Sequence, residues 1–192
     1  MRKLFIGLAA LALMTSCGSQ PVASTTPTPQ SSPSSSAAAS PTPSAAPSPT
    51  IPAGFAFQDF SGGSVSGNDV VSVTIGQHPG YDRIVIQFAS DIPSYSATRQ
   101  SNSTFTRSPK GDQVTLQGSA GVLIVVHSVT NWTSYGGPTS FDAGYPYMKE
   151  VQMVENFEGY QQWALGVQGE PALRVMTLTN PSRLVVDVAV AG

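Results

Sequence analysis

The sequence contains a single cysteine, Cys17, and only two histidines, His78 and His127. Cys17 has no partner for an internal disulfide, and the rest of the chain offers no thiol for catalysis or metal binding. There is no His-Glu-x-x-His motif, and residues 62–67 lack the Gly-x-Ser-x-Gly spacing of a hydrolase nucleophile elbow. We therefore expect a non-enzyme with no catalytic residues, no metal site and no cofactor.

Charge is scarce as well. Charged residues make up only 10% of the sequence, and none occurs between Lys3 and Asp59. Residues 55–192 hold seven basic and eleven acidic side chains, which gives a net charge of −4. This balance argues against binding to nucleic acid and against adhesion to anionic lipid headgroups. Low charge density with many glycines is typical of an extracytoplasmic β-protein.

The N-terminus has the pattern of an export signal. A basic start is followed by an apolar run, residues 4–13, that is too short to span a bilayer. Residues 14–17, Met-Thr-Ser-Cys, resemble the bacterial lipobox, which implies cleavage after residue 16 and acylation of Cys17. Two or three acyl chains, at about 0.8 kcal/mol per buried CH2, would anchor the chain to the membrane. The alternative is an ordinary cleaved signal with an incidental cysteine.

Residues 17–54 follow as a tether. From residue 19 to residue 50 the chain is almost entirely Ser, Thr, Pro and Ala. Such a composition has too little apolar surface to offset the entropy lost on ordering, so we expect this segment to be disordered. Its extended reach is on the order of 100 Å, enough to hold a domain away from the membrane.

Residues 55–192 are long enough for one domain, and their pattern predicts β-strands. After a Pro79-Gly80 turn, residues 81–88 alternate strictly, with Asp82 and three apolar side chains on one face, as expected of a half-buried strand. Residues 180–188 repeat the order of proline turn, arginine and apolar strand. We expect these two strands to be the first and last of the domain and neighbours in one sheet.

Further extended runs fall at residues 70–75, 95–99, 113–117, 121–128, 148–155, 163–167 and 173–178, separated by turn residues at the spacing of a β-sandwich. Residues 121–128 are apolar on both faces, which predicts a central strand. The polar residues 100–112 predict a hairpin loop. In residues 148–162, charged residues also allow one or two helical turns. The expected fold is an all-β, single-domain sandwich.

Several motifs in this region resemble the AMIN-like domain. They are Gly76-x-His78, residues 80–88 (Gly-Tyr-Asp-Arg-Ile-Val-Ile-Gln-Phe), Val151 with Phe157-Glu-Gly159, Leu165-Gly-Val167, Leu173-Arg-Val-x-x-Leu178, and residues 181–188 (Pro-Ser-Arg-Leu-Val-Val-Asp-Val). The resemblance implies a β-sandwich, export to the cell envelope and peptidoglycan binding. It transfers no catalytic residue, because this module is not itself the enzyme in wall amidases that carry it.

The remaining polar residues have two interpretations each. His127 alternates with Leu123 and Val125, which favours a hydrogen-bonded core histidine, and His78 in its turn favours a structural role over ligand contact. Arg83 or Arg183 could grip a stem-peptide carboxylate through the planar guanidinium fork. The alternative for the arginines is an ion pair within the domain that fixes the register of two strands.

A long loop, residues 131–147, is the best candidate binding surface because it carries Trp132, Tyr135, Phe141, Tyr145 and Tyr147 among glycines and prolines. Aromatic faces with polar tips suit sugar rings or a protein partner, but the same rings could fold back over an open end of the sandwich. Two functions remain: a membrane-anchored module that binds peptidoglycan or another wall glycan, and an envelope scaffold that binds another exported protein.

Overall fold

The computed structural model describes residues 50–127, 130 and 135–191. Cys17, the predicted signal and most of the predicted tether therefore lie outside the described residues. Residues Ala46–Gly192 form one compact unit that contains all the strands. The described residues include no helix long and apolar enough to cross a membrane.

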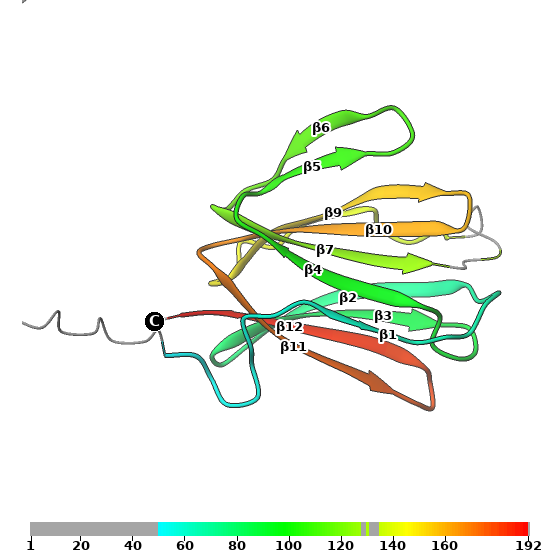
Figure 1. Ribbon diagram of the computed structural model, residues 1–192, viewed down its shortest axis with the longest axis horizontal. Coiled ribbons are helices and arrows are strands. Elements are labelled where there is room, and N and C mark those ends of the chain that lie inside the picture. The colour runs from blue at the N-terminus through cyan, green and yellow to red at the C-terminus, as the bar shows by residue number, and fades with distance from the viewer. Residues whose placement is uncertain (1–49, 128–129, 131–134, 192) are drawn as a thin grey trace, which may run out of the picture. The chain divides into compact units, whose positions relative to one another are not determined.

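The expectation of an all-β fold is confirmed, with no helix in the described part of the chain (Figure 1). Two sheets pack face to face. The six-stranded sheet has the order β1 (Phe60–Gly62), β4 (Tyr95–Gln100), β7 (Ala120–His127), β10 (Tyr160–Val167), β9 (Met148–Phe157) and β8 (Ser140–Asp142). The four-stranded sheet has the order β11 (Pro171–Leu178), β12 (Arg183–Val190), β3 (Tyr81–Phe88) and β2 (Val70–His78).

Strand alternation builds the core between the two sheets. Along β3, every second residue from Asp82 to Phe88 is buried, as the sequence pattern predicts. Trp163 of β10 is the largest fully buried side chain, and it packs in one cluster with apolar residues of both sheets. Burying each large apolar side chain in such a cluster contributes about 1.5–3 kcal/mol.

The predicted neighbours β3 and β12 do pair, antiparallel, with Asp187 opposite Arg83. β12 is the last strand, as expected, but β3 is not the first, because β1 and β2 precede it. β7 is central in its sheet, as expected. The helical alternative for residues 148–162 is wrong, since β9 and β10 cover most of them and form an antiparallel pair.

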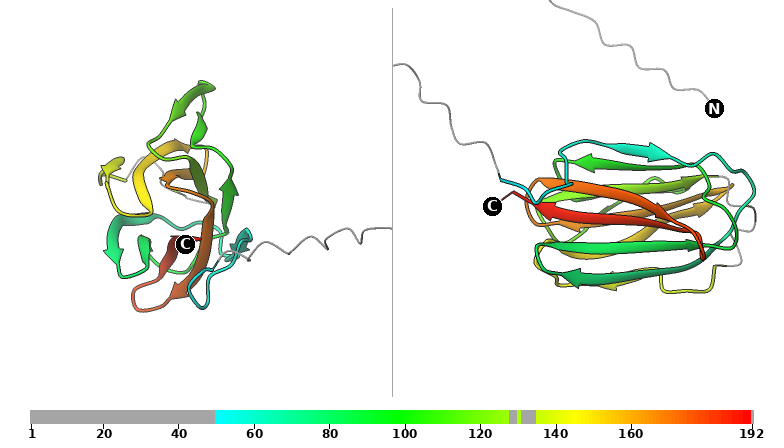
Figure 2. Two further views of the ribbon diagram at one scale, coloured as in Figure 1. Left: turned by 90° about the vertical axis from the view of Figure 1, so that its left-hand side faces the viewer. Right: turned by 90° about the horizontal axis from the view of Figure 1, so that it is seen from below.

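The polar segment 100–112, predicted to be a loop, contains β5 (Thr104–Arg107), which pairs with β6 (Asp112–Thr115). This hairpin lies on the side of the six-stranded sheet that faces away from the other sheet (Figures 1 and 2). Phe105 and Leu116 pack there on Ala164. A side chain at Gly166 would meet the carbonyl oxygen of Gln117 at 2.0 Å, so only glycine allows this close approach.

Candidate functional site

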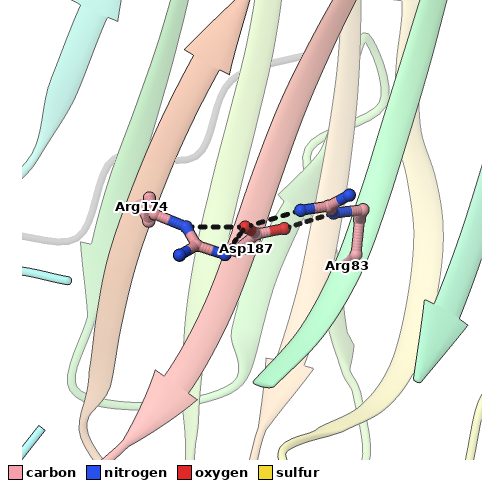
Figure 3. A network of polar contacts seen from close by, with 3 residues as sticks. All are labelled: Arg83, Arg174 and Asp187. Carbon is pink, nitrogen blue, oxygen red and sulfur yellow. Dashed lines mark hydrogen bonds and ion pairs between the residues drawn. The ribbon is translucent and has the colours of Figure 1, made fainter. Parts of the chain in front are cut away.

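The outer face of the four-stranded sheet brings two arginines to one carboxylate. Arg83 on β3, Asp187 on β12 and Arg174 on β11 stand side by side in the register of the three strands. All three side chains point away from the core, because their neighbours along each strand, such as Ile84 and Val186, point into it. Figure 3 shows the two guanidinium groups on either side of the carboxylate.

The contacts are short and charge-assisted. Arg83 donates to both oxygens of Asp187, from Nε to Oδ1 at 2.6 Å and from Nη2 to Oδ2 at 3.0 Å. Arg174 donates to Oδ2 from Nε at 2.9 Å and from Nη2 at 2.7 Å. Asp187 is fully buried, whereas the side chains of Arg83 and Arg174 keep 25% and 30% of their surface exposed. The hydrogen bond with Asp187 raises the pKa of Arg83.

These contacts confirm the expected ion pair within the domain for Arg83, since it links neighbouring strands β3 and β12. Arg183 takes no part in it and donates from Nε to the carbonyl oxygen of Pro181 at 3.2 Å. Arg174 is a functional candidate that the sequence reasoning missed. Arg174 could have been found only from the register of β11 against β12, which places it opposite Asp187. The distance between Arg83 and Arg174 along the chain does not reveal this register.

Aromatic rings flank the arginines on the same face. The Cζ atom of Arg174 lies 4.7 Å from the ring centroid of Phe55 and 4.8 Å from that of Tyr81. Arg83 lies 5.4 Å from the Tyr81 ring. His78 stacks on Tyr81 with centroids 4.8 Å apart, a contact that fits the structural role expected for it. The rings hold the guanidinium planes in place through cation–π attraction.

The charge of this face is opposite in sign to that of the domain. The outward-facing side chains of β2, β3, β11 and β12 include Arg83, Arg174, Arg183 and a single carboxylate, Asp187. The face thus carries a net charge of +2, while residues 55–192 together carry −4. We refer to it as the arginine face. A positive patch on an acidic domain favours an anionic ligand at this place.

Three of the described rings on the aromatic loop, those of Tyr135, Phe141 and Tyr145, pack against the core. Tyr135 packs edge-on against buried Trp163, with centroids 5.9 Å apart, and its hydroxyl donates to the carbonyl oxygen of Pro138. Phe141 lies 6.3 Å from the same indole ring. Tyr145 also packs against the core. Burial raises the pKa of Tyr135. These contacts show that the three rings fold back onto the sandwich, which favours a covering role over ligand contact.

The end of the loop is fixed by a buried acid. Oδ2 of Asp82 accepts hydrogen bonds from the backbone N–H groups of Tyr147 and Met148, both at 2.8 Å. Tyr147 is half-buried. Residues 131–147 were expected to form a loop, but they contain the short strand β8. Trp132, the other candidate on this loop, lies outside the described residues.

The expectation for His127 is wrong. Its side chain is exposed on the outer face of β7 and stacks on Tyr160, with ring centroids 4.3 Å apart. Alternation with Leu123 and Val125 was correct, but those two residues also point outward, where the β5–β6 hairpin covers Leu123 and not His127. Among residues 50–127, 130 and 135–191, no three His, Cys, Asp or Glu side chains gather closely enough to hold a metal ion.

A cleft of about 410 Å³ opens where β10 crosses over to β11. Its lining includes Arg99, Ser119 and Glu170, which come from separate segments and were not predicted. The polar contacts of the Arg99 side chain are long, from Nη1 to Glu170 and to the carbonyl oxygen of Pro171, both at 3.4 Å, and from Nε to Asp59 at 3.6 Å. The cleft is lined by one basic and one acidic side chain, Arg99 and Glu170, so it lacks the net positive charge of the arginine face.

One of three comparisons with known proteins gives a match. A family model described as the AMIN-like domain matches residues 68–190, which is well over half of the chain. No curated protein and no solved structure matches the chain significantly. The matched segment begins just before β2 and ends with β12, so it includes both arginines and the carboxylate of the arginine face. The chain therefore belongs to the AMIN-like domain family, which is associated with peptidoglycan binding in the cell envelope, and is an extracytoplasmic, envelope-associated protein.

Proposed function

We propose that this chain is a non-catalytic envelope lipoprotein, anchored to the membrane through acylated Cys17, whose domain binds peptidoglycan. The arginine face would grip the carboxylates of stem peptides. Residues 17–54 would serve as the tether that gives the domain its reach into the wall.

The observation that carries this proposal is the way two guanidinium groups share one carboxylate. Each arginine donates to Asp187 from Nε and Nη2. The third nitrogen, Nη1, has no hydrogen-bond partner among the described residues in either arginine. Two guanidinium groups and one carboxylate give the cluster a net charge of +1, and both arginine side chains are partly exposed. An arriving carboxylate would find donors that are already oriented, so little entropy is lost on binding.

Arg183 adds a third cation to the same face. It stands opposite Gln87 of β3, on the same side of the sheet as Arg83. Stem peptides carry carboxylates at intervals along a glycan strand, so a face with several cations can hold more than one of them at once. This multivalency raises the apparent affinity of weak single contacts.

Sedimentation with insoluble peptidoglycan tests the proposal. The parent chain should sediment with the wall, and the double variant Arg174→Gln, Arg183→Gln should sediment much less, because two of three outward cations are gone while the Arg83–Asp187 pair remains. Arg107→Gln is the matched control, since Arg107 is an exposed arginine on the β5–β6 hairpin. Circular dichroism must show that all variants are folded.

Two results would contradict the proposal. Equal sedimentation of parent and double variant would remove the arginine face from wall binding. A folded parent that stays in the supernatant would remove direct wall binding altogether and leave the scaffold function, in which the domain recognises another exported protein.

The anchor needs its own experiment. Metabolic labelling with a palmitate analogue should modify the parent chain and not Cys17→Ser, and the variant should leave the membrane fraction. An unlabelled parent, or a Cys17→Ser chain that keeps the label, would refute acylation at this residue.

A further inference from the structure

The four sheet edges of this sandwich are protected very unequally. In the six-stranded sheet the edge strands β1 and β8 are only three residues long. In the four-stranded sheet, β11 is partly covered, because Ala56 and Leu173 exchange two backbone hydrogen bonds of 2.9 Å. The remaining edge strand, β2, is nine residues long (Figure 2, right).

The free side of β2 has little of the usual protection, since the only irregularity in its pairing with β3 is a shift between Val70 and Ser72, at its start. Its backbone pairs with β3 on one side, and the described residues offer no backbone hydrogen bond to residues 71–78 on the other. The strand contains no charged residue and no proline. Edge strands of soluble monomers are normally short, or carry lysine or proline, because a long uncharged edge is a template for another strand. Val71, at 52% exposure, adds apolar surface at its start.

We propose that β2 is a homodimer interface, at which the β2 strands of two copies pair antiparallel about a two-fold axis and join the two four-stranded sheets into one. The sequence of β2 favours a register centred on Thr74. In that register Thr74 faces Thr74 of the partner, and Val73 faces the partner's Ile75.

Three physical arguments support this occupant over an arbitrary strand. First, Val73 and Ile75 both point into the core, opposite Ile86 and Ile84, so pairing them extends an existing apolar layer across the axis. Second, the paired threonines can hydrogen-bond, and no like charges meet, because the strand is uncharged. Third, an antiparallel pair of identical strands is closed by its own symmetry, so it gives a dimer and no open polymer.

The dimer would also join the two arginine faces. Gly76 of β2 stands directly opposite Arg83 of β3, so the clusters of both copies would lie on one continuous sheet surface. Anchoring both copies to one membrane would raise their effective concentration and favour pairing through this small interface. This inference goes beyond wall binding and does not depend on it.

Sedimentation equilibrium of the full-length chain in detergent, over concentrations up to about 1 mM, tests the proposal directly. With rising concentration, the mass of the parent should approach twice the mass of its own single chain. Thr74→Glu and Thr74→Lys should each remain monomeric, because two like charges would then face each other at the axis. Thr74 is exposed, so neither change disturbs the core.

A mixture of Thr74→Glu and Thr74→Lys should recover the two-chain mass, since opposite charges then meet at the axis. Thr177→Glu is the matched control, because Thr177 is an exposed threonine on the opposite edge strand, β11, and this variant should dimerise like the parent. A parent that stays monomeric at all concentrations would overturn the proposal. So would single Thr74 variants that dimerise as well as the parent, or a mixture that gains nothing. None of these outcomes concerns sedimentation with peptidoglycan.

Discussion

Removing the buried Asp187 carboxylate should be among the most destabilising single changes on the outer face of the four-stranded sheet. In the variant Asp187→Asn, two guanidinium groups lose the carboxylate to which they donate four hydrogen bonds. The replacing amide is neutral and offers only one acceptor oxygen. The two positive charges of Arg83 and Arg174 then repel each other across a site that was fully buried.

The magnitude follows from burial. Breaking a buried ion pair by removing one partner costs about 3–5 kcal/mol. Here both arginines keep about a quarter to a third of their side-chain surface in water, so solvent compensates for part of the loss, and we take the lower limit of about 3 kcal/mol. Because the total stability of a domain is about 5–15 kcal/mol, this loss would be a large fraction of it.

Urea unfolding followed by circular dichroism measures this loss. With a slope of about 2 kcal/mol per molar, the midpoint of Asp187→Asn should fall by about 1.5 M. Arg174→Gln should cost much less, about 1 kcal/mol, because the two bonds from Arg83 to Asp187 survive. A loss below about 1 kcal/mol for Asp187→Asn would refute the reasoning, since the triad would then be worth no more than an exposed salt bridge.

Three further predictions concern the free energy of unfolding. Asp82→Ala should lower it by about 2–3 kcal/mol and Asp82→Asn by much less, because an amide oxygen can still accept hydrogen bonds from the two loop N–H groups. Equal losses in the two variants would contradict this reasoning. Gly166→Ala should lower the free energy of unfolding by about 1–3 kcal/mol, since its Cβ would clash with the carbonyl oxygen of Gln117. An unchanged unfolding midpoint would show that the hairpin moves to accept the methyl group at no cost. Because burial raises the pKa of Tyr135 above its value of 10.0 in the unfolded chain, the folded state holds this proton more tightly. Stability should therefore fall as pH rises above 10, and Tyr135→Phe should weaken that fall, while an identical pH profile would contradict it.

The sequence was most informative where alternation alone shows which residues share a face. The strict alternation of residues 81–88 located β3, and its similarity to residues 180–188 predicted that the two strands are neighbours. Both predictions depend only on local periodicity and on two matching turns. The arginine pair with Asp187 was foreseen in part, because cross-strand partners follow once two strands are known to be adjacent.

Failures occurred where a second layer decides which face is buried. Alternation correctly placed His127 on the same face of β7 as Leu123 and Val125. Whether His127 is buried depends on what covers that face, which alternation does not show. The cover is the β5–β6 hairpin, whose strands are polar and whose first strand, β5, lies in a segment predicted to be a loop. Arg174 and the cleft beside Arg99 were missed for a related reason, since both are assembled by contacts between distant segments.

The inward fold of the aromatic loop shifts the expected binding surface from loops to strands. Trp163 is fully buried, and the rings of Tyr135 and Phe141 pack against it. These two rings therefore contribute to the core, and their removal would expose Trp163. Arg83, Arg174 and Arg183, in contrast, stand on hydrogen-bonded strands that fix their spacing along and across the sheet. A repeating polymer with carboxylates at intervals is better matched by such a regular array than by a loop, because the array loses less conformational entropy on binding. The same reasoning explains why dimerisation through β2 would matter: it extends the array without adding a flexible joint.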